Sequence, residues 1–425
     1  MNQPPTVATP LTREERSWVL YDVANSAFVL VMVTAIMPIY FKDIAARGMP
    51  AAESTAYWGF ANAAASLILA LLAPILGALA DSRGRKKAFF SSFLGAGLLL
   101  TVALAFVGSG HWLLCLTLFV LARVGWAGAN IFYDSFLVDV TTLHRMDTVS
   151  SRGYAYGYIG SVVPFLIVIG LILSAGTSGD TLPGPQARVG FIVVALWWLI
   201  FSLPALRDLR QRHFAPIADP VVTSSFRRLL ATLRDIRRHR QAFVFLIAYF
   251  FFIDGVGTII SMSTAYGRDL GFGVTLLIAV LLVIQVVAFP FALLFGRLAG
   301  WFGTKNTLLA GIAVYCLITL LAFLLPFIAD PAAKIALFWL IALLVASSMG
   351  GIQALSRSYF GRLIPPAKSA EFFGFYNIFG KFAAISGPLL MGLITRATGD
   401  SRWGVLSILL LFAIGGWILS RIKED

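Results

Sequence analysis

The chain has 425 residues, of which 59% are hydrophobic and 12% are charged, and its formal net charge is +13. Soluble domains carry about 25% charged residues, so this composition excludes an ordinary soluble protein. It indicates an integral membrane protein whose helices each need about 20 apolar residues to cross the bilayer. Because the apolar segments are continuous rather than alternating, a membrane β-barrel is also excluded.

Twelve apolar segments are predicted to cross the membrane as helices. In chain order they cover residues 17–41, 55–80, 88–108, 111–141, 152–174, 188–205, 241–266, 273–297, 306–327, 334–360, 371–394 and 403–421. The two cysteines, Cys115 and Cys316, lie inside apolar segments and predict no disulfide. Residues 1–16 are polar and lack the apolar core of a signal peptide, so we expect the first span to be retained.

Lysine and arginine gather on one side of the predicted spans. With both termini on that side, it holds 23 of the 33 basic residues, the other side holds 7, and three lie within spans. The positive-inside rule then places both termini in the cytoplasm of a multi-pass protein of the cell (inner) membrane. Since this distribution accounts for most of the +13, we expect no nucleic-acid partner.

A basic segment, residues 206–240, carries nine arginines and separates two sets of six spans. The predicted organisation is a cytoplasmic tail, an N-terminal six-helix bundle, a basic cytoplasmic linker, a C-terminal six-helix bundle and a short tail, at residues 1–16, 17–205, 206–240, 241–421 and 422–425. The linker sequence SSFRRLLATLRDIRRHRQ favours either an amphipathic helix on the anionic cytoplasmic leaflet or a plain basic connection.

One short motif occurs in both halves of the chain. The first copy, GALADSRGRK, begins at residue 77, and the second, GRLAGWFGTK, begins at residue 296, so the offset is 219 residues. Parallel repeats of this kind are typical of secondary transporters whose substrate site lies near the membrane midplane, between the halves. The second copy has Gly300 in the position of Asp81.

The G-x-L-A-D-x-x-G-R-K loop, the twelve spans and the long central loop resemble the major facilitator superfamily. The resemblance implies an all-α fold of twelve transmembrane helices in two pseudo-symmetric six-helix bundles. It also implies that Asp81 contacts the positive N-terminal end of the span that begins near Glu371, and that this contact latches the outward-open state. The basic residues of the loop, including Arg85, would hold it at the cytoplasmic surface.

A closer resemblance covers most of the chain. The first span contains WVLYDVANSAF from Trp18, the seventh contains DGVGTI from Asp254, and the tenth and eleventh contain GGIQALSRS and EFFGFYNIFGK. Together these segments resemble the vacuolar-effluxer-like group, also called the "unknown major facilitator" family. The eukaryotic members of that group are linked to amino-acid efflux from vacuoles.

Ionisable side chains inside predicted spans are costly and usually face a protein interior or a water-filled cavity. Six such residues are Asp22, Arg123, Asp134, Asp254, Arg357 and Lys381. At a rise of about 1.5 Å per residue, Arg123, Lys381 and Asp254 lie near the midplane, and the other three lie nearer the cytoplasmic ends. Helical spacing adds polar neighbours on the same faces, among them Asn25, Asn130, Tyr158, Gln353 and Asn377.

These residues are assigned three roles as expectations. The predicted substrate contacts, suited to an anionic or zwitterionic solute, are Asn25, Arg123, Asn130, Tyr158, Gln353, Asn377 and Lys381. Asp22 and Asp254 are the predicted proton-coupling carboxylates, and Asp81, Arg85, Asp134 and Arg357 are the predicted gating residues. Arg123 also resembles a buried fourth-span arginine of proton-coupled members of the superfamily. One alternative interpretation is a set of structural ion pairs that hold the two halves together. Another is that Asp22, Asp134 and Arg357 snorkel to the cytoplasm.

The predicted function is secondary active transport of a small polar solute, such as an amino acid, peptide or related metabolite, by alternating access with proton coupling. The alternatives are a membrane scaffold or sensor with the same fold, or multidrug efflux. The sequence has no nucleotide-binding loop, and its four histidines do not cluster, so we expect no enzyme activity, cofactor or metal site. We expect the protein to be a monomer in the bilayer.

Overall fold

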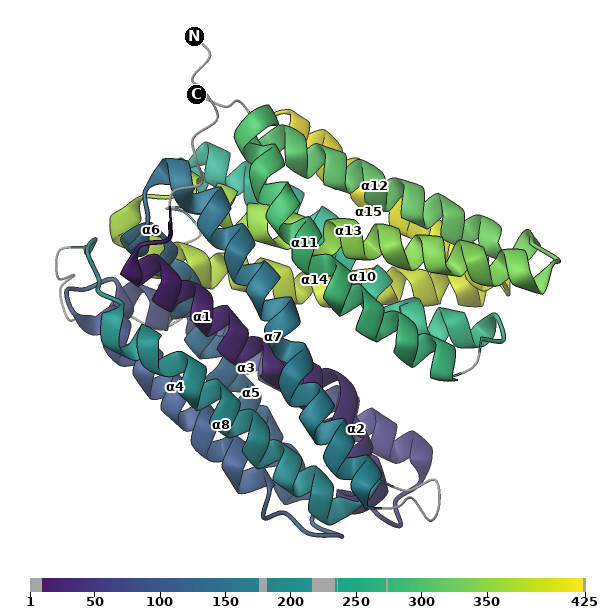
Figure 1. Cartoon of the computed structure of the whole chain (residues 1–425). Helices are drawn as coiled ribbons and strands as arrows, with labels where there is room; N and C mark the ends of the chain where they lie inside the picture. Colours follow the sequence, from purple (N-terminus) through teal and green to yellow (C-terminus); the bar gives the residue numbers. More distant parts are fainter. Residues whose placement is uncertain (1–9, 176–181, 216–233, 235, 273, 423–425) are drawn as a thin grey trace.

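The computed structural model describes residues 10–175, 182–215, 234, 236–272 and 274–422. Helices form almost all of this part of the chain (Figure 1). The predicted amphipathic helix of the linker falls mostly on residues 216–233, which lie outside the described residues.

The first half of the chain contains the helices that precede the linker. The first span is α1 (Arg13–Phe28) and α2 (Ile36–Tyr40) with the π-helical turns Val29–Ala35 and Phe41–Ala45. The others are α3 (Ala51–Ala80), α4 (Arg85–Leu104), α5 (Trp112–Ser135) continued by α6 (Leu137–Val140), α7 (Met146–Ser174) and α8 (Gly184–Asp208). We call this set the N half.

The second half, which we call the C half, contains six long helices. They are α10 (Arg240–Asp269), α11 (Val274–Phe302), α12 (Thr304–Leu324), α13 (Pro331–Leu363), α14 (Ser369–Thr398) and α15 (Ser401–Ser420). Ten helical segments in the described part of the chain are long and apolar enough to cross a membrane. With α3 and α14 the long helical segments of the described residues number twelve, and the predicted ends differ from the observed ones by at most six residues. The predicted all-α fold is confirmed.

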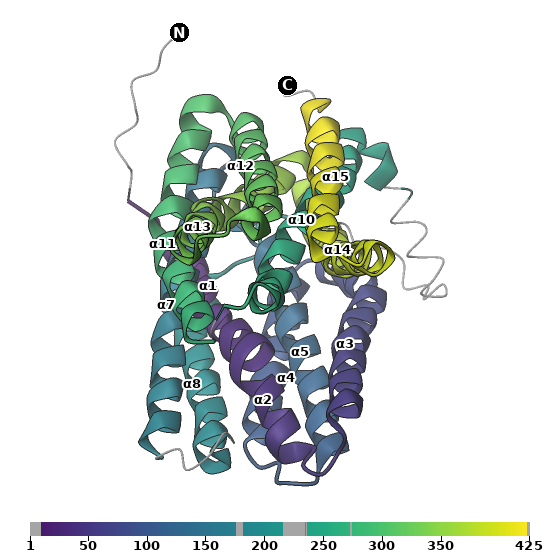
Figure 2. The same cartoon turned by 90° about the vertical axis from the view of Figure 1, so that its right-hand side faces the viewer.

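Each half packs around its own apolar core. One core joins buried residues from Trp18 to Leu209 and the other joins buried residues from Ile236 to Ile422. Both described ends of the chain lie on one side of the molecule, which we call the terminal side. The two halves meet there, with α3 against α14 and α7 against α11 and α13, and they diverge toward the opposite side (Figures 1 and 2).

Close helix contacts repeat in the two halves with the offset of the sequence motif. A Cβ built on Gly77 of α3 would lie 2.5 Å from the Ala370 carbonyl oxygen of α14. A Cβ built on Gly296 of α11 would lie 2.8 Å from Cβ of Ser151 on α7. Since residues 151 and 370 are also 219 positions apart, the same contact joins the halves twice. Glycine is required at both places because only a helix without a side chain can approach so closely.

We expect Gly77→Ala to destabilise the folded protein by about 1–3 kcal/mol, because the added methyl group meets backbone atoms that cannot move aside. Gly300→Ala is the matched control, since a Cβ there meets no atom within 4 Å. Thermal unfolding of the purified protein measures both. Equal melting temperatures for the two variants would contradict the close packing of α3 on α14.

Candidate functional site

Arg357 of α13 is the centre of the contact between the halves. Its side chain is only 2% exposed. Nη2 donates to Oδ2 of Asp22 on α1 at 2.9 Å, and Nη1 donates to Oδ1 of Asp134 on α5 at 3.2 Å. The guanidinium therefore ties the C half to two helices of the N half. The possibility that these three side chains snorkel to the surface is wrong for this state, because all three are buried.

Further groups of the N half surround the same guanidinium. Nε donates to the Ser150 hydroxyl at 3.0 Å, and Nη2 donates to the Ser150 carbonyl at 3.2 Å. The ring centroids of Trp18 and Tyr154 each lie 4.4 Å from Cζ of the Arg357 guanidinium. A planar guanidinium is well suited to such stacking because it is weakly hydrated. Sequence reasoning missed Ser150, since the predicted fifth span began two residues later.

A second interface cluster is built on Asp147, in the first turn of α7. Its carboxylate accepts hydrogen bonds from Thr304 at 2.7 Å, Ser358 at 2.5 Å and Arg362 at 2.6 Å. Arg362 also bonds the Thr304 hydroxyl. The second copy of the loop motif lacks an aspartate at Gly300, but here the helix on the other side of the contact supplies the carboxylate. Sequence reasoning placed Asp147 in a loop and so missed it.

The third interface cluster contains the predicted latch. Asp81 accepts hydrogen bonds from the backbone N–H groups of Ala370 at 2.9 Å and Glu371 at 2.8 Å, at the start of α14. The predicted contact with this helix end is therefore present. A carboxylate suits the site because the first N–H groups of a helix lack partners within it and carry partial positive charge. Its gating role stays a prediction.

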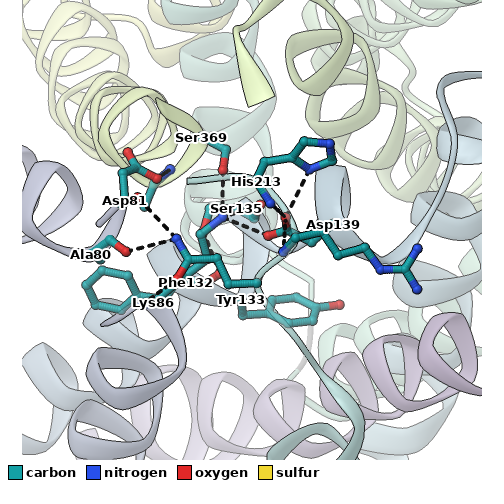
Figure 3. A network of polar contacts seen from close by, with 12 residues as sticks. Ala80, Asp81, Lys86, Phe132, Tyr133, Ser135, Asp139, His213 and Ser369 are labelled. Carbon is teal, nitrogen blue, oxygen red and sulfur yellow. Dashed lines mark hydrogen bonds and ion pairs between the residues drawn. The ribbon is translucent and has the colours of Figure 1, made fainter. Parts of the chain in front are cut away.

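The cation that completes this cluster is Lys86, which sequence reasoning missed, and the gating role of Arg85 stays a prediction. Arg85 begins α4 and is exposed, whereas Lys86 is fully buried. Nζ of Lys86 donates to the Ser369 hydroxyl at 2.7 Å and to Asp139 at 2.8 Å (Figure 3). One helical position separates the two residues, and the orientation of α4 decides which of them points inward.

The start of the linker is fastened to the same cluster. Oδ1 of Asp139 accepts from the backbone N–H groups of Arg212 and His213, both at 2.9 Å, and lies 3.1 Å from Nδ1 of His213 (Figure 3). The Gln211 amide donates to the Asp81 carbonyl at 3.2 Å. The latch loop, α14 and the chain after α8 are therefore held as one unit.

Deeper residues of the predicted site lie between these clusters and the opposite side. Nε2 of Gln353 on α13 donates to the Tyr158 hydroxyl of α7 at 3.1 Å, which joins the halves. The Asn377 amide of α14 donates to Asp134 at 3.3 Å. Asn25 is buried, and its amide donates to the Tyr21 carbonyl within α1 at 2.9 Å.

On α5, two predicted substrate contacts have buried polar atoms without hydrogen-bond partners in the described structure. These atoms are Nη1 of Arg123 and Oδ1 of Asn130.

Asp254 is separate from the groups that join the halves. Its carboxylate is buried within the C half and accepts from the Ser386 hydroxyl at 2.5 Å and the Gly387 N–H at 2.8 Å. The structure therefore does not bring the two predicted coupling carboxylates together, because Asp22 belongs to the Arg357 cluster. Lys381 is part of α14, but its side chain lies outside the described residues.

Solved structures show which class of fold this is. The chain superimposes on the proton:xylose symporter XylE with a TM-score of 0.74 at 11% identity, over 97% of this chain and 96% of that one. It superimposes on an outward-facing bacterial homologue of the iron transporter ferroportin with a TM-score of 0.70 at 16% identity, over 96% and 98%. The protein is a multi-pass membrane protein with the fold of the major facilitator superfamily.

Residues 51–425 match the family model described as "Vacuole effluxer Atg22 like". The chain is 48% identical over 418 residues to the "Uncharacterized MFS-type transporter YxiO" of Bacillus subtilis (strain 168), over 97% of this chain and 96% of that relative. It is 28% identical over 318 residues to autophagy-related protein 22 of Coccidioides immitis, over 69% of this chain and 52% of the fungal protein. It thus spans about half the length of that relative. The chain belongs to the Atg22-like vacuole effluxer family, as the sequence motifs predict.

We expect Arg357→Gln to weaken the closed terminal side, because the loss of one partner from a buried ion pair costs about 3–5 kcal/mol. Asp22 and Asp134 would be left as buried carboxylates without their cation. The readout is alkylation of Ser151→Cys, a buried position at the contact of α7 with α11, with both native cysteines replaced by alanine. The alkylation rate should rise in the Arg357→Gln background and much less with Arg357→Lys. An unchanged rate in both would contradict the role of Arg357.

A pH dependence follows from the burial of Asp81, which lies just outside the apolar part of α3. Burial raises the pKa of its carboxyl to about 7, although Lys86 and the N–H groups of α14 act in the other direction. An exposed aspartate has a pKa of about 3.9, so the closed latch binds the proton more tightly than an open one. The proton therefore stabilises the latch below pH about 7, and this stabilisation is lost as the pH rises through that value.

The measurement is hydrogen exchange of the Ala370 and Glu371 amides, corrected for the intrinsic effect of pH. Their protection should fall as the pH rises through about 7, and Asp81→Asn, which cannot ionise, should show protection independent of pH. The same pH dependence in both proteins would refute the assignment.

Proposed function

We propose that the protein is a secondary transporter that moves a small zwitterionic solute, such as an amino acid, a peptide or a related metabolite, by alternating access. The terminal side is the cytoplasmic side in this proposal, as the distribution of basic residues favours. The described state is closed on that side.

The observation that carries the proposal is the pair of unpartnered polar atoms on α5. A buried charged donor without a partner is costly, and most buried polar groups are hydrogen-bonded. Nη1 of Arg123 and Oδ1 of Asn130 have no partner in the described structure. Their spacing of seven residues puts them on one face of the helix, the face that also carries Asp134. A solute carboxylate would satisfy the arginine, and a solute ammonium group would donate to the asparagine.

Both halves supply neutral polar groups at their interface. Gln353 and Tyr158 bond each other across the interface, and Asn377 bonds Asp134. These amides and the hydroxyl can exchange their present bonds for bonds to a solute at little cost, because none of them carries a charge. A polar solute is therefore favoured over an amphipathic drug, which would leave these groups unsatisfied.

The three interface clusters suit a gate. They join the halves through Arg357, Asp147 and Asp81 on the terminal side of the molecule. Opening the terminal side requires these bonds to break, so their free energy sets the population of the state open to the cytoplasm. A scaffold or sensor would need no such exchange, and measured solute flux separates it from a transporter.

Proton coupling is best assigned to Asp254. Asp22 pairs with Arg357 and so belongs to the contact between the halves. Asp254 instead accepts hydrogen bonds from two neutral donors of its own half, the Ser386 hydroxyl and the Gly387 N–H. Asp254 is therefore not committed to holding the halves together, and this leaves it available for coupling.

We expect Arg123→Gln to abolish stabilisation of the purified protein by a transported amino acid, because glutamine cannot balance a carboxylate. The test is a thermal-shift screen over amino acids and small peptides, followed by flux of each hit into proteoliposomes. Arg396→Gln, at an exposed position on the opposite side, is the control and should behave as the wild type. Hits that stabilise Arg123→Gln as strongly as the wild type would remove Arg123 from the site, and absence of any flux would favour the scaffold.

A further inference from the structure

The site that Arg357 occupies is built by the other half of the molecule. Its hydrogen bonds and ring contacts in the described structure go to α1, α5 and α7, whereas Arg357 belongs to α13. The ring of Tyr133 adds a third face, with its centroid 5.6 Å from Cζ. A cation of the C half therefore lies in a cation site of the N half. We call the six residues of this site the N-half cage: Trp18, Asp22, Tyr133, Asp134, Ser150 and Tyr154.

The cage is held together by contacts within the N half. Nε1 of Trp18 donates to the Tyr133 carbonyl at 2.9 Å, and the two rings stack with their centroids 4.6 Å apart. Gly153 of α7 leaves room for the acidic side, because a Cβ there would collide with Oδ2 of Asp22. These contacts join α1, α5 and α7 without help from the C half. The cage therefore keeps its shape when the C half moves away.

The charge of the cage is not balanced once the halves separate. In the described part of the chain its two carboxylates, Asp22 and Asp134, face one guanidinium. Opening of the terminal side withdraws Arg357 and also Asn377, whose amide donates to Asp134 at 3.3 Å. A buried carboxylate without a partner is costly, and a nearby cation lowers that cost. An open cage therefore favours a cation from the solution on the terminal side.

The chemistry of the cage selects the kind of cation. A guanidinium group is planar and weakly hydrated, and it combines several donors with two faces for aromatic rings. The cage matches both, since its carboxylates and the Ser150 oxygens accept hydrogen bonds while the rings of Trp18 and Tyr154 lie 4.4 Å from Cζ. A metal cation would leave the rings unused. We propose that the N-half cage is a binding site for the guanidinium group of a small solute, which takes the place of Arg357 when the terminal side opens.

The position of the cage makes it an entry site. Asp134 follows Arg123 by eleven residues of α5, which is about 16 Å at a rise of about 1.5 Å per residue. A solute from the terminal side thus meets the cage before the proposed contacts at Arg123 and Asn130. This order of contacts rests on the proposed transport function, and it requires a solute that carries a guanidinium group in addition to its carboxylate. The affinity of the cage for a guanidinium ion does not rest on it.

The first test measures the affinity of the empty cage. Arg357→Ala removes the present occupant, and the melting temperature of the purified variant is compared in millimolar methylguanidinium chloride and methylurea at equal ionic strength. The two compounds have similar shapes, but only the first is charged. Arg362→Ala is the matched control, because it removes a guanidinium from the buried Asp147, where the Tyr359 ring centroid is 6.0 Å from Cζ of Arg362.

Methylguanidinium should raise the melting temperature of Arg357→Ala by about 2 °C and methylurea should not, because a ligand that binds only the folded protein stabilises it. Arg362→Ala should respond to neither compound. Equal responses to the two compounds, or equal responses of the two variants, would overturn the cage as a guanidinium site.

The second test keeps the native Arg357 and shows whether a free guanidinium displaces it. Alkylation of Ser151→Cys, in the background without native cysteines, is measured in L-arginine and in L-citrulline, which has a similar shape without the side-chain charge. The rate should rise roughly tenfold at about ten times the dissociation constant of L-arginine and stay constant in L-citrulline. Asp134→Asn should abolish the rise.

A rate that is unchanged in L-arginine, or raised equally by both amino acids, would overturn the displacement of Arg357. Neither test measures solute flux, so the proposed transport function stands or fails separately.

Discussion

A guanidinium buried at the contact of two helical halves is the constraint on which the described state depends. Arg357 carries a full charge at 2% exposure, so it must be paired, and its acidic partners belong to the other half. A buried ion pair adds little net stability compared with apolar packing. It does, however, disfavour arrangements of the halves in which one of the buried charges loses its partner. The pairing with Asp22 and Asp134 therefore fixes how the halves meet on the terminal side.

The other two clusters show that the repeated halves form equivalent helix contacts with different residues. The close helix contacts at Gly77 and Gly296 occur at equivalent positions in the two halves, because they depend only on the close approach of two helix backbones. The carboxylates are not repeated. Asp81 extends from the loop to the start of α14, whereas Asp147 lies in the first turn of α7 and receives bonds from α12 and α13. The geometry of the interface is thus symmetric, while its electrostatics are not.

Much of this architecture could be predicted from the sequence, because span length and hydropathy reflect bilayer thickness. The loop motif also indicated the contact of Asp81. Partners across the interface could not be predicted, since they depend on how each helix is rotated about its axis. A rotation of one residue separates the exposed Arg85 from the buried Lys86, and a span predicted to begin at residue 152 left Asp147 and Ser150 in a loop. Asp254 was predicted near the midplane, but that prediction did not show that it faces α14 within its own half.

The central claim is that the Arg357 cluster holds one of two alternating arrangements of the halves. Distances between spin labels test it most directly, with one pair at exposed Thr142 and Gly300 on the terminal side and another at exposed Ser109 and Ala332 on the opposite side. The account predicts that Arg357→Gln lengthens the terminal distance and shortens the opposite one in the same molecules. Two unchanged distances, or two that lengthen together, would contradict it.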